Sequence, residues 1–291
     1  MDTEKCYALL RSIELGSLSA AAQELGYTVS GMSRLVLSLE DELGFRLLNR
    51  SRSGVVPTRE CELLLPAIRD LARWAESSRQ LAGEVRGLET GRIRVGMSYP
   101  AYYPALGEAV SGFSREHPGV EIALFEGTSS VLAGALERRE ADFCVMSRRE
   151  TGCAWTPLTT DSLAVWLPAN HPLAHLAAYP AAELERETYI DISPGEETDN
   201  SRFLAERGIN VRRRASTSDV YGALSLVGAG LGVALVNTLL ARGIDTGHRA
   251  VLLPLDPPYL VEIGAAYHPP EEQSPAARRF TDYALARLSA L

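Results

Sequence analysis

Residues 16–58, GSLSAAAQELGYTVSGMSRLVLSLEDELGFRLLNRSRSGVVPT, decide the fold of the first part of this chain. Ser17 or Ser19 can cap a short helix that runs through three consecutive alanines and stops at Gly26. Thr28 can cap a second, longer helix. Two short helices joined by a tight turn predict a helix-turn-helix, in which the second helix presents its first residues to base edges in the major groove of DNA.

The second helix has two different faces. On one face, apolar residues spaced four, three and four apart would pack against the rest of the head: Met32, Val36, Leu39 and Leu43. Near its start, four residues could contact bases: Val29, Ser30, Ser33 and Arg34. Hydroxyls can exchange hydrogen bonds with base edges, an arginine can pair with guanine or hold a phosphate, and a valine can contact a thymine methyl group. This edge of the helix is the predicted DNA reader.

The segment that follows, Gly44–Thr58, predicts a hairpin with a basic tip. Leu47–Leu48 and Val55–Val56 would form its two arms. Arg50 and Arg52 at the tip would contact the flanking minor groove or phosphates, which position a protein on DNA without reading its sequence.

A helix is expected over Thr3–Gly16, and a long one from Thr58 to about Leu88. Within the long helix, seven residues follow a four-three heptad rhythm: Leu64, Ile68, Leu71, Ala75, Ser78, Ala82 and Val85. The rhythm indicates a coiled-coil-like helix that pairs two copies of the chain, and packing within one chain is the alternative. Pro66 would remove one backbone hydrogen bond and kink the helix slightly.

After Gly91 the pattern changes to strands that alternate with helices. Two neighbouring strands are expected near Trp155–Leu158 and Leu163–Leu167, and a second run of strands and helices begins at Tyr189. Leu260–Tyr267 is the last expected strand, before a final helix. Such alternation predicts an α/β fold with mostly parallel sheets and helices on both faces.

Ligands of such sheets lie beyond the carboxyl ends of the strands, so polar residues that follow strands are candidate ligand-binding residues. They are Ser98, Tyr99, Pro100, Thr128, Ser129, Ser147, Arg148, Ser193 and Thr217. Hydroxyls and free amides at helix starts can bind an anion, and Arg148 would clamp a carboxylate. The alternative is that the hydroxyls only cap helices and that Arg148 and Arg149 are solvated. The expected partner is a small molecule, with an anion as one possibility.

Composition and motifs exclude several classes of protein. The net charge of −8 points to modest non-specific DNA affinity. The four cysteines are scattered and form no C-x-x-C pair, so we expect no metal or cofactor. No catalytic motif is present, which argues against an enzyme. The chain has no apolar run long enough to span a membrane, and its start does not resemble a secretory signal, so we expect a cytoplasmic protein.

The sequence of residues 16–58 resembles the winged helix-turn-helix of the LysR-type transcriptional regulators. The pattern S-x-x-x-A-A-x-x-L, an S-R pair in the second helix, L-E-x-x-L-G-x-x-L-x-x-R and a closing P-T carry the likeness. Later segments match as well: GRIRVGMS, HPGVEIALFEG, LPANHPL and VGAGLGVALV. The resemblance implies DNA contacts by Thr28, Val29, Ser30, Ser33 and Arg34, and by Arg50, Arg52 and Thr58 in the wing and the start of the linker. Departures at Val29, Ser30, Gly31 and Leu37 bear on which operator is read.

The resemblance also implies a domain plan. Residues 1–58 would form the DNA-binding domain, 59–90 a linker helix that dimerises, and 91–291 a two-lobed effector domain like that of periplasmic binding proteins. Lobe I would comprise 91–163 and 268–291, and lobe II 164–267, with an effector bound between them. Such proteins are homodimers or homotetramers that bind promoter DNA. The alternatives are a molybdate-type or other winged-helix regulator, and a solute-binding protein that does not bind DNA.

Overall fold

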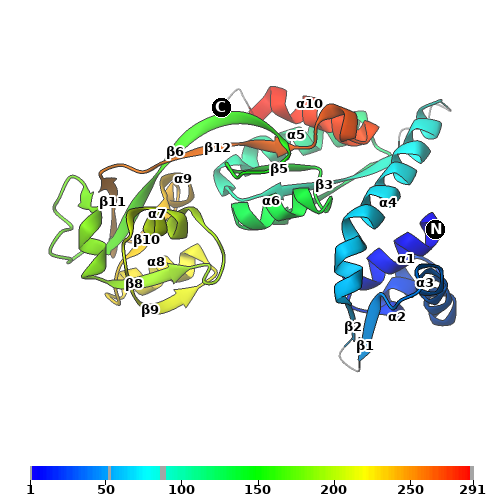
Figure 1. Ribbon diagram of the computed structural model, residues 1–291. Helices are drawn as coiled ribbons and strands as arrows, with labels where there is room; N and C mark the ends of the chain where they lie inside the picture. The colour runs from blue at the N-terminus through cyan, green and yellow to red at the C-terminus, as the bar shows by residue number, and fades with distance from the viewer. Residues whose placement is uncertain (1, 52–53, 86–89, 289–291) are drawn as a thin grey trace. The chain divides into compact units, whose positions relative to one another are not determined.

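The chain forms two structural units in a computed structural model that describes residues 2–51, 54–85 and 90–288 (Figure 1). The first unit spans Met1–Gly91 and includes Ser274–Ala276. The second unit spans Arg92–Gln273 and Ala277–Leu291. In the part of the chain that the structure describes, no helix has the length and apolar character needed to cross a bilayer.

The first unit begins with three helices and a two-stranded hairpin. Their bounds are α1 Thr3–Glu14, α2 Leu18–Glu24, α3 Val29–Leu43, β1 Leu48–Ser51 and β2 Gly54–Pro57. Ser17 is the residue that caps α2, and Thr28 caps α3 as the sequence predicts. Helix α3 ends at Gly44, whose left-handed φ of 82° suits glycine. The first arm of the hairpin runs farther than expected, to Ser51.

Helix α4, Arg59–Val85, packs against α1, and its first half belongs to the core of this unit. Cys61, Leu65 and Ile68 are buried there beside the apolar face of α3. Ile68 therefore lies in the core of its own chain, and the predicted dimer heptad is wrong at this position. For the first half of the helix the alternative holds, which is packing within one chain. Ser78 and Ala82 of that heptad are exposed.

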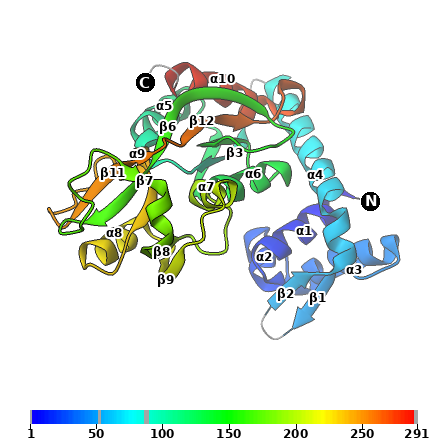
Figure 2. The ribbon, with the colours of Figure 1, turned by 60° about the vertical axis from the view of Figure 1, so that its left-hand side comes forward.

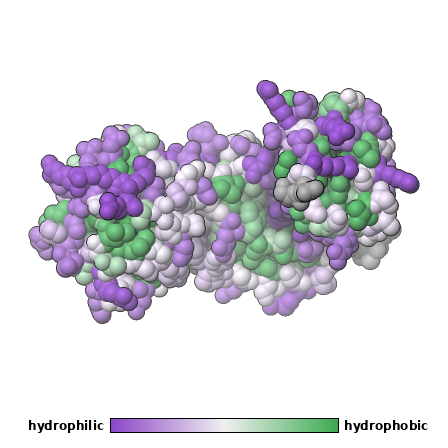
Figure 3. Space-filling model, turned by 90° about the horizontal axis from the view of Figure 1, so that it is seen from below, coloured by the Kyte–Doolittle hydropathy of each residue, from purple (hydrophilic) through white to green (hydrophobic). Residues whose placement is uncertain are grey.

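The apolar side chains that α4 leaves exposed are a different set: Leu63, Trp74 and Leu81. In Figure 3, apolar patches interrupt a surface that is largely hydrophilic.

An eight-stranded sheet forms the framework of the second unit, in the order β4-β3-β5-β12-β6-β11-β7, with β10 also paired to β6. The strands are β3 Gly91–Met97, β4 Val120–Glu126, β5 Phe143–Ser147, β6 Ala154–Pro168, β7 Tyr179–Pro180, β10 Ala234–Asn237, β11 Ala250–Asp256 and β12 Leu260–Tyr267. Strands β8 Thr188–Ile192 and β9 Arg212–Thr217 form a separate parallel pair.

The expectation of mostly parallel sheets is wrong. β3 pairs in parallel with β5, but β12 is antiparallel to both β5 and β6, and β10 and β11 are antiparallel to β6. The two strands expected between Trp155 and Leu167 are one continuous strand of 15 residues, β6. β6 pairs with β12 along its first part and with β10 and β11 along its second, so all the antiparallel neighbours of β6 are arranged along one strand.

Helices cover the two ends of this framework, which we call lobe I (around β3, β4 and β5) and lobe II (around β8, β9, β10 and β11). In lobe I, α5 Tyr103–Glu116 and α10 Pro275–Leu288 lie on one face and α6 Ser129–Glu137 on the other (Figures 1 and 2). Lobe II carries α7 Asp199–Arg207, α8 Val220–Gly228 and α9 Thr238–Ala241. The lobe bounds of the sequence analysis stay a prediction, except that Ile263–Tyr267, expected in lobe II, pair with β5 of lobe I.

Candidate functional site

The start of α3 presents polar side chains to solvent. Thr28, Ser30 and Arg34 are exposed, and Val29 keeps 52% of its surface accessible. Thr28 accepts a hydrogen bond from the backbone N–H of Gly31 at 3.0 Å, which satisfies one of the free donors at the helix start. The predicted reading edge is therefore accessible, while Met32, Val36 and Leu39 on the opposite face are fully buried.

The β1–β2 hairpin, the wing, contacts this helix. Nη1 of Arg50 donates to Oγ of Ser33 across 2.9 Å, so the half-buried hydroxyl of α3 and an exposed wing cation lie together. The backbone N–H of Val55 donates to the carbonyl of Gly16 at 2.9 Å and ties the wing to the turn between α1 and α2. Arg52, the other predicted wing cation, lies outside the described residues.

A buried carboxylate holds the base of the wing. Oε1 of Glu40 accepts hydrogen bonds from the backbone N–H groups of Leu47 at 2.7 Å and Leu48 at 3.1 Å, and the residue is only 7% exposed. Sequence reasoning saw Glu40 only as one member of an acidic cluster. The signal that was available is the α-helical spacing, which places Glu40 four residues after Val36 and eight after Met32, on the inward side of α3.

Thr58 has a structural role in place of the DNA contact that the sequence analysis expects. The residue is buried, its hydroxyl donates to the carbonyl of Arg46 at 2.9 Å, and it accepts from the N–H of Cys61 at 3.1 Å. It therefore caps α4, and both the donor and the acceptor capacity of its hydroxyl are used inside the protein.

In the second unit, strand ends and helix starts of both lobes surround a pocket of about 470 Å³. Six of the predicted ligand-binding residues line it: Ser98, Tyr99, Pro100, Thr128, Ser129 and Ser193. Three do not: Ser147, Arg148 and Thr217. Ser147 is fully buried behind the lining, where its N–H donates to Oγ of Ser129 at 3.0 Å. The hydroxyl of Thr217 donates to the carbonyl of Asp219 and accepts from the N–H of Asp219, in the turn before α8.

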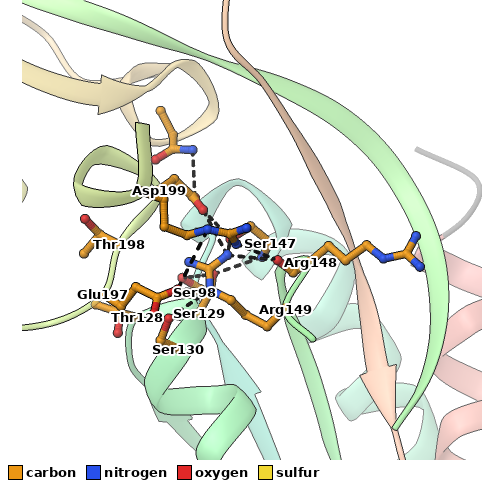
Figure 4. Close-up of polar contacts among 12 residues, drawn as sticks. Ser98, Thr128, Ser129, Ser130, Ser147, Arg148, Arg149, Glu197, Thr198 and Asp199 are labelled. Atoms are coloured by element: carbon orange, nitrogen blue, oxygen red, sulfur yellow. Dashed lines mark hydrogen bonds and ion pairs between the residues drawn. The ribbon is translucent and has the colours of Figure 1, made fainter. Parts of the chain in front are cut away.

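Arg149, rather than Arg148, lies at the pocket (Figure 4). Successive residues of an extended strand point to opposite sides. Arg149 therefore points to the same side as Ser147, toward the pocket, and Arg148 points to the other side. The side chain of Arg148 is 61% exposed and pairs with Glu262 at 3.0 Å. The side chain of Arg149 is 7% exposed, and its Nε donates to Oγ of Ser130 at 2.9 Å.

Asp199, in the first turn of α7, joins the two lobes through one buried carboxylate. Oδ1 accepts from Oγ of Ser147 at 2.8 Å and lies 3.1 Å from Nη1 of Arg149. Oδ2 accepts from the Tyr99 hydroxyl at 2.8 Å and from the Asn237 amide at 3.2 Å. Ser147, Arg149 and Tyr99 belong to lobe I, whereas Asp199 and Asn237 belong to lobe II. Burial raises the pKa of the Tyr99 phenol well above its ordinary value, and the Asp199 charge adds to the effect.

The pocket lining also contains carboxylates and amides that sequence reasoning missed: Glu126, Glu196, Asp199, Asn200, Asp219 and Asn237. Glu126 accepts a hydrogen bond from the hydroxyl of Tyr103, whose pKa is raised by burial and by this carboxylate. Asp219 caps α8 through the N–H groups of Tyr221 and Gly222. Acidic residues that flank a strand are common on any protein surface, so nothing in the sequence alone distinguished these. In the described ranges, no group of three or more potential ligands could hold a metal ion.

Comparison with known proteins matches both units. The family model of the LysR substrate binding domain matches residues 86–289, and that of the bacterial regulatory helix-turn-helix protein, lysR family, matches residues 4–62. The uncharacterized HTH-type transcriptional regulator YvbU of Bacillus subtilis (strain 168) is 27% identical over 272 residues, which are 93% of each chain.

Solved structures share the fold over the full length. A full-length OxyR from Pseudomonas aeruginosa superposes with a TM-score of 0.72 at 19% identity and covers 99% of this chain and 98% of its own. Full-length CbnR in complex with its target DNA gives a TM-score of 0.60 at 19% identity and covers 99% of this chain and 100% of its own.

Proposed function

The chain belongs to the LysR family of DNA-binding transcriptional regulators, and we propose that it reads promoter DNA with the exposed start of α3 and senses a small molecule in the pocket of its second unit. The observation that carries the first half is the exposure of Ser30 and Arg34, with the half-buried Ser33 beside them, on a helix whose other face is buried. In this motif such an edge enters the major groove.

The DNA interface that we propose consists of Thr28, Val29, Ser30, Ser33 and Arg34 on α3, with Arg50 and Arg52 on the wing. The test is fluorescence anisotropy with a labelled duplex from the region upstream of the protein's own gene. Wild-type binding should weaken linearly on a log–log plot against salt. Arg34→Ala should cost about 1–3 kcal/mol of binding, whereas Arg115→Ala, an exposed arginine on α5, should leave affinity unchanged. Equal affinities for the two variants would remove Arg34 from the interface.

Members of this family form oligomers and bind small-molecule effectors, and the second unit supplies a site of the required kind. We infer that the pocket binds its ligand without transforming it, so that the protein acts as a regulator and not as an enzyme. The lobes are joined across the pocket by the Asp199 contacts, so a ligand that fills the pocket would change how they are held. The place of action that we propose is the cytoplasm, where promoter DNA is found.

The same binding assay tests the sensor half. A ligand that raises the thermal unfolding temperature must bind the folded state, because stabilisation follows mass action. Such a ligand should also change the affinity of the protein for the operator duplex, or the length of DNA that the bound protein protects from nuclease cleavage. A ligand that binds the pocket and changes neither would argue against a sensor.

A further inference from the structure

We propose that the effector of this protein is an organic cation: a small molecule that carries a protonated nitrogen on an apolar body and a hydrogen-bond acceptor at its other end. The inference rests on the proposed function of the pocket as the effector site. It names the class of ligand, which neither the family nor the fold determines.

The charge of the lining is the first argument. Four carboxylates line the pocket, from Glu126, Glu196, Asp199 and Asp219, and among the described residues Arg149 is its only cationic side chain. The guanidinium of Arg149 already pairs with Asp199, and both side chains are more than nine-tenths buried. The carboxylates of Glu126, Glu196 and Asp219 therefore face the pocket without a cation from its lining. A cleft lined by one sign of charge concentrates ligands of the opposite sign.

The helix starts around the pocket give the second argument. The positive end of a helix can bind an anion, and five helices begin at residues of the lining: α5, α6, α7, α8 and α9. However, the start of α8 is already occupied by the side chain of Asp219, which accepts from two of its N–H groups at 3.2 and 3.0 Å. Asp199 lies in the first turn of α7. The other three, α5, α6 and α9, have no acidic residue at the N-cap or in the first turn. Two of the five helix starts thus carry their own carboxylate.

A buried acceptor without a donor is the third and independent argument. The amide of Asn200 lines the pocket, the residue is 7% exposed, and its Nδ2 donates to the carbonyl of Leu235 at 2.9 Å. This bond fixes the orientation of the amide, and Oδ1 has no hydrogen-bond partner in the described part of the chain. Buried polar atoms are normally paired, so Oδ1 can accept a hydrogen bond from an N–H or O–H donor. Oδ1 is closed to solvent, so we infer that a shift of this amide toward the pocket would let a protonated nitrogen of the ligand act as that donor.

At Arg149 it is a donor, not an acceptor, that lacks a partner: its Nη2 has no hydrogen-bond acceptor among the described residues. An ether, carbonyl or carboxylate oxygen of the ligand would satisfy it. Between these polar groups the lining is apolar, with Met97, Ile192, Val236 and Leu240. The pocket therefore favours a cationic or zwitterionic molecule over a simple carboxylate.

The electrostatic part is tested with a thiol placed in the pocket, so that the result does not depend on finding the effector. Val131 lines the pocket and is 42% exposed, and Val131→Cys is made in a Cys153→Ser background because the other cysteines are fully buried. The rates of modification by a trimethylammonium and by a sulfonate methanethiosulfonate are compared.

We expect the ratio of cationic to anionic rate to exceed that of Ser111→Cys, an exposed site on α5, by about tenfold. Glu126→Gln combined with Asp219→Asn, which keeps a helix-capping side chain, should lower this ratio toward the control value. A ratio at or below that of Ser111→Cys overturns the proposal.

Ligand binding is tested with three probes of similar shape: 2-phenylethylamine, phenylalanine and 3-phenylpropionate. A larger rise of the unfolding temperature with the amine or with the amino acid than with the carboxylate supports the proposal, and stabilisation by the carboxylate alone overturns it. Operator binding is measured on the same samples. A protein that fails to bind DNA contradicts the proposed function, whereas one that binds DNA but prefers the anionic probes contradicts only the class of ligand.

Discussion

Nη1 of Arg50 in the wing lies 2.9 Å from Oγ of Ser33 in α3, so a hydrogen bond joins the wing to the predicted reading edge of α3. This hydrogen bond orients the Arg50 guanidinium, whose charge can reach a DNA phosphate. The Ser33 hydroxyl only accepts in this bond, so its own proton can still be donated to a base edge. Ser33 thus helps to hold the wing in place and is also part of the helix surface that we propose contacts DNA.

Ser33→Ala removes the acceptor for Arg50 and one polar group of the reading edge. We expect operator binding to weaken by about 1–3 kcal/mol in an anisotropy titration, while the free energy of unfolding changes by less than about 0.5 kcal/mol. Ser38→Ala, at a half-buried serine farther along α3, is the matched control. Equal losses for the two variants would show that Ser33 has no special place at the interface.

Asp199→Ala leaves the buried Arg149 guanidinium without its carboxylate. Removing one partner of a buried ion pair costs about 3–5 kcal/mol, and urea unfolding of the full chain should show a loss in this range. The double variant with Arg149→Ala should recover part of it. The exposed pair Arg148–Glu262 provides the comparison, because Arg148→Ala should cost about 0–1 kcal/mol and leaves Glu262 in place to accept from Nε1 of Trp155. A similar loss for both pairs would contradict the role given to Asp199.

Glu40→Ala should loosen the wing, because the N–H groups of Leu47 and Leu48 lose their acceptor. Each buried donor left unpaired costs about 1–3 kcal/mol. Glu40→Gln retains a carbonyl oxygen that can accept both bonds and should lose less. Asp41→Ala, at an exposed neighbour, should be neutral in chemical denaturation. If Glu40→Ala were as stable as Asp41→Ala, the hydrogen bonds at the base of the wing would not contribute to stability.

Trp74 should be an anchor of self-association. It is 50% exposed on α4, with Leu63 and Leu81 also exposed along the helix, and the guanidinium of Arg73 lies 4.3 Å from its ring centroid. Aromatic anchors of interfaces typically cost about 2 kcal/mol or more when truncated, or roughly thirtyfold in affinity. Trp74→Ala should raise the dimer dissociation constant by about that factor in sedimentation velocity. Leu260→Ala, at an exposed leucine of β12, should not change it.

Alkaline pH should destabilise the first unit through Cys61. Burial raises the pKa of this thiol from 9.0 to about 11. Below pH 9 the thiol is protonated in the folded and unfolded states, so its contribution does not vary. Between pH 9 and about 11 only the unfolded state ionises, and stability falls by up to about 1.4 kcal/mol per pH unit. Urea unfolding at pH 7.5, 9 and 10.5 should show a smaller decline for Cys61→Ala than for the wild type. Parallel declines would assign the pH dependence to other groups.

The sequence predicted local structure well where a cap and an amphipathic period agreed. Thr28 and the four-three spacing of Met32, Val36, Leu39 and Leu43 specify the same helix, and α3 begins directly after Thr28 and ends at Leu43. The predicted heptad of α4 was less informative, because Ile68 meets the period of a dimer helix and also that of a helix packed on its own chain. Periodicity identifies an apolar face but does not say what covers it.

Non-local arrangement accounts for the rest. The continuity of β6 was missed because a run of four polar residues, 159–162, separates its two apolar parts at the point where its partners change. The choice between Arg148 and Arg149 depends on a single residue of strand register, which reverses the side that each one faces. Asp199 and Asn200 lie in lobe II, far along the chain from the lobe I residues beside them, so only the folded structure brings this part of the pocket together.

β6 is one continuous strand that both lobes of the second unit share. Its backbone is bonded to β12 from Ala154 to Ser162 and to β10 and β11 beyond that point, so the two lobes share one uninterrupted ribbon. A reorientation of the lobes would therefore have to bend or twist β6, along with the ladder that it forms with β12, whose register shifts between Ile263 and Gly264.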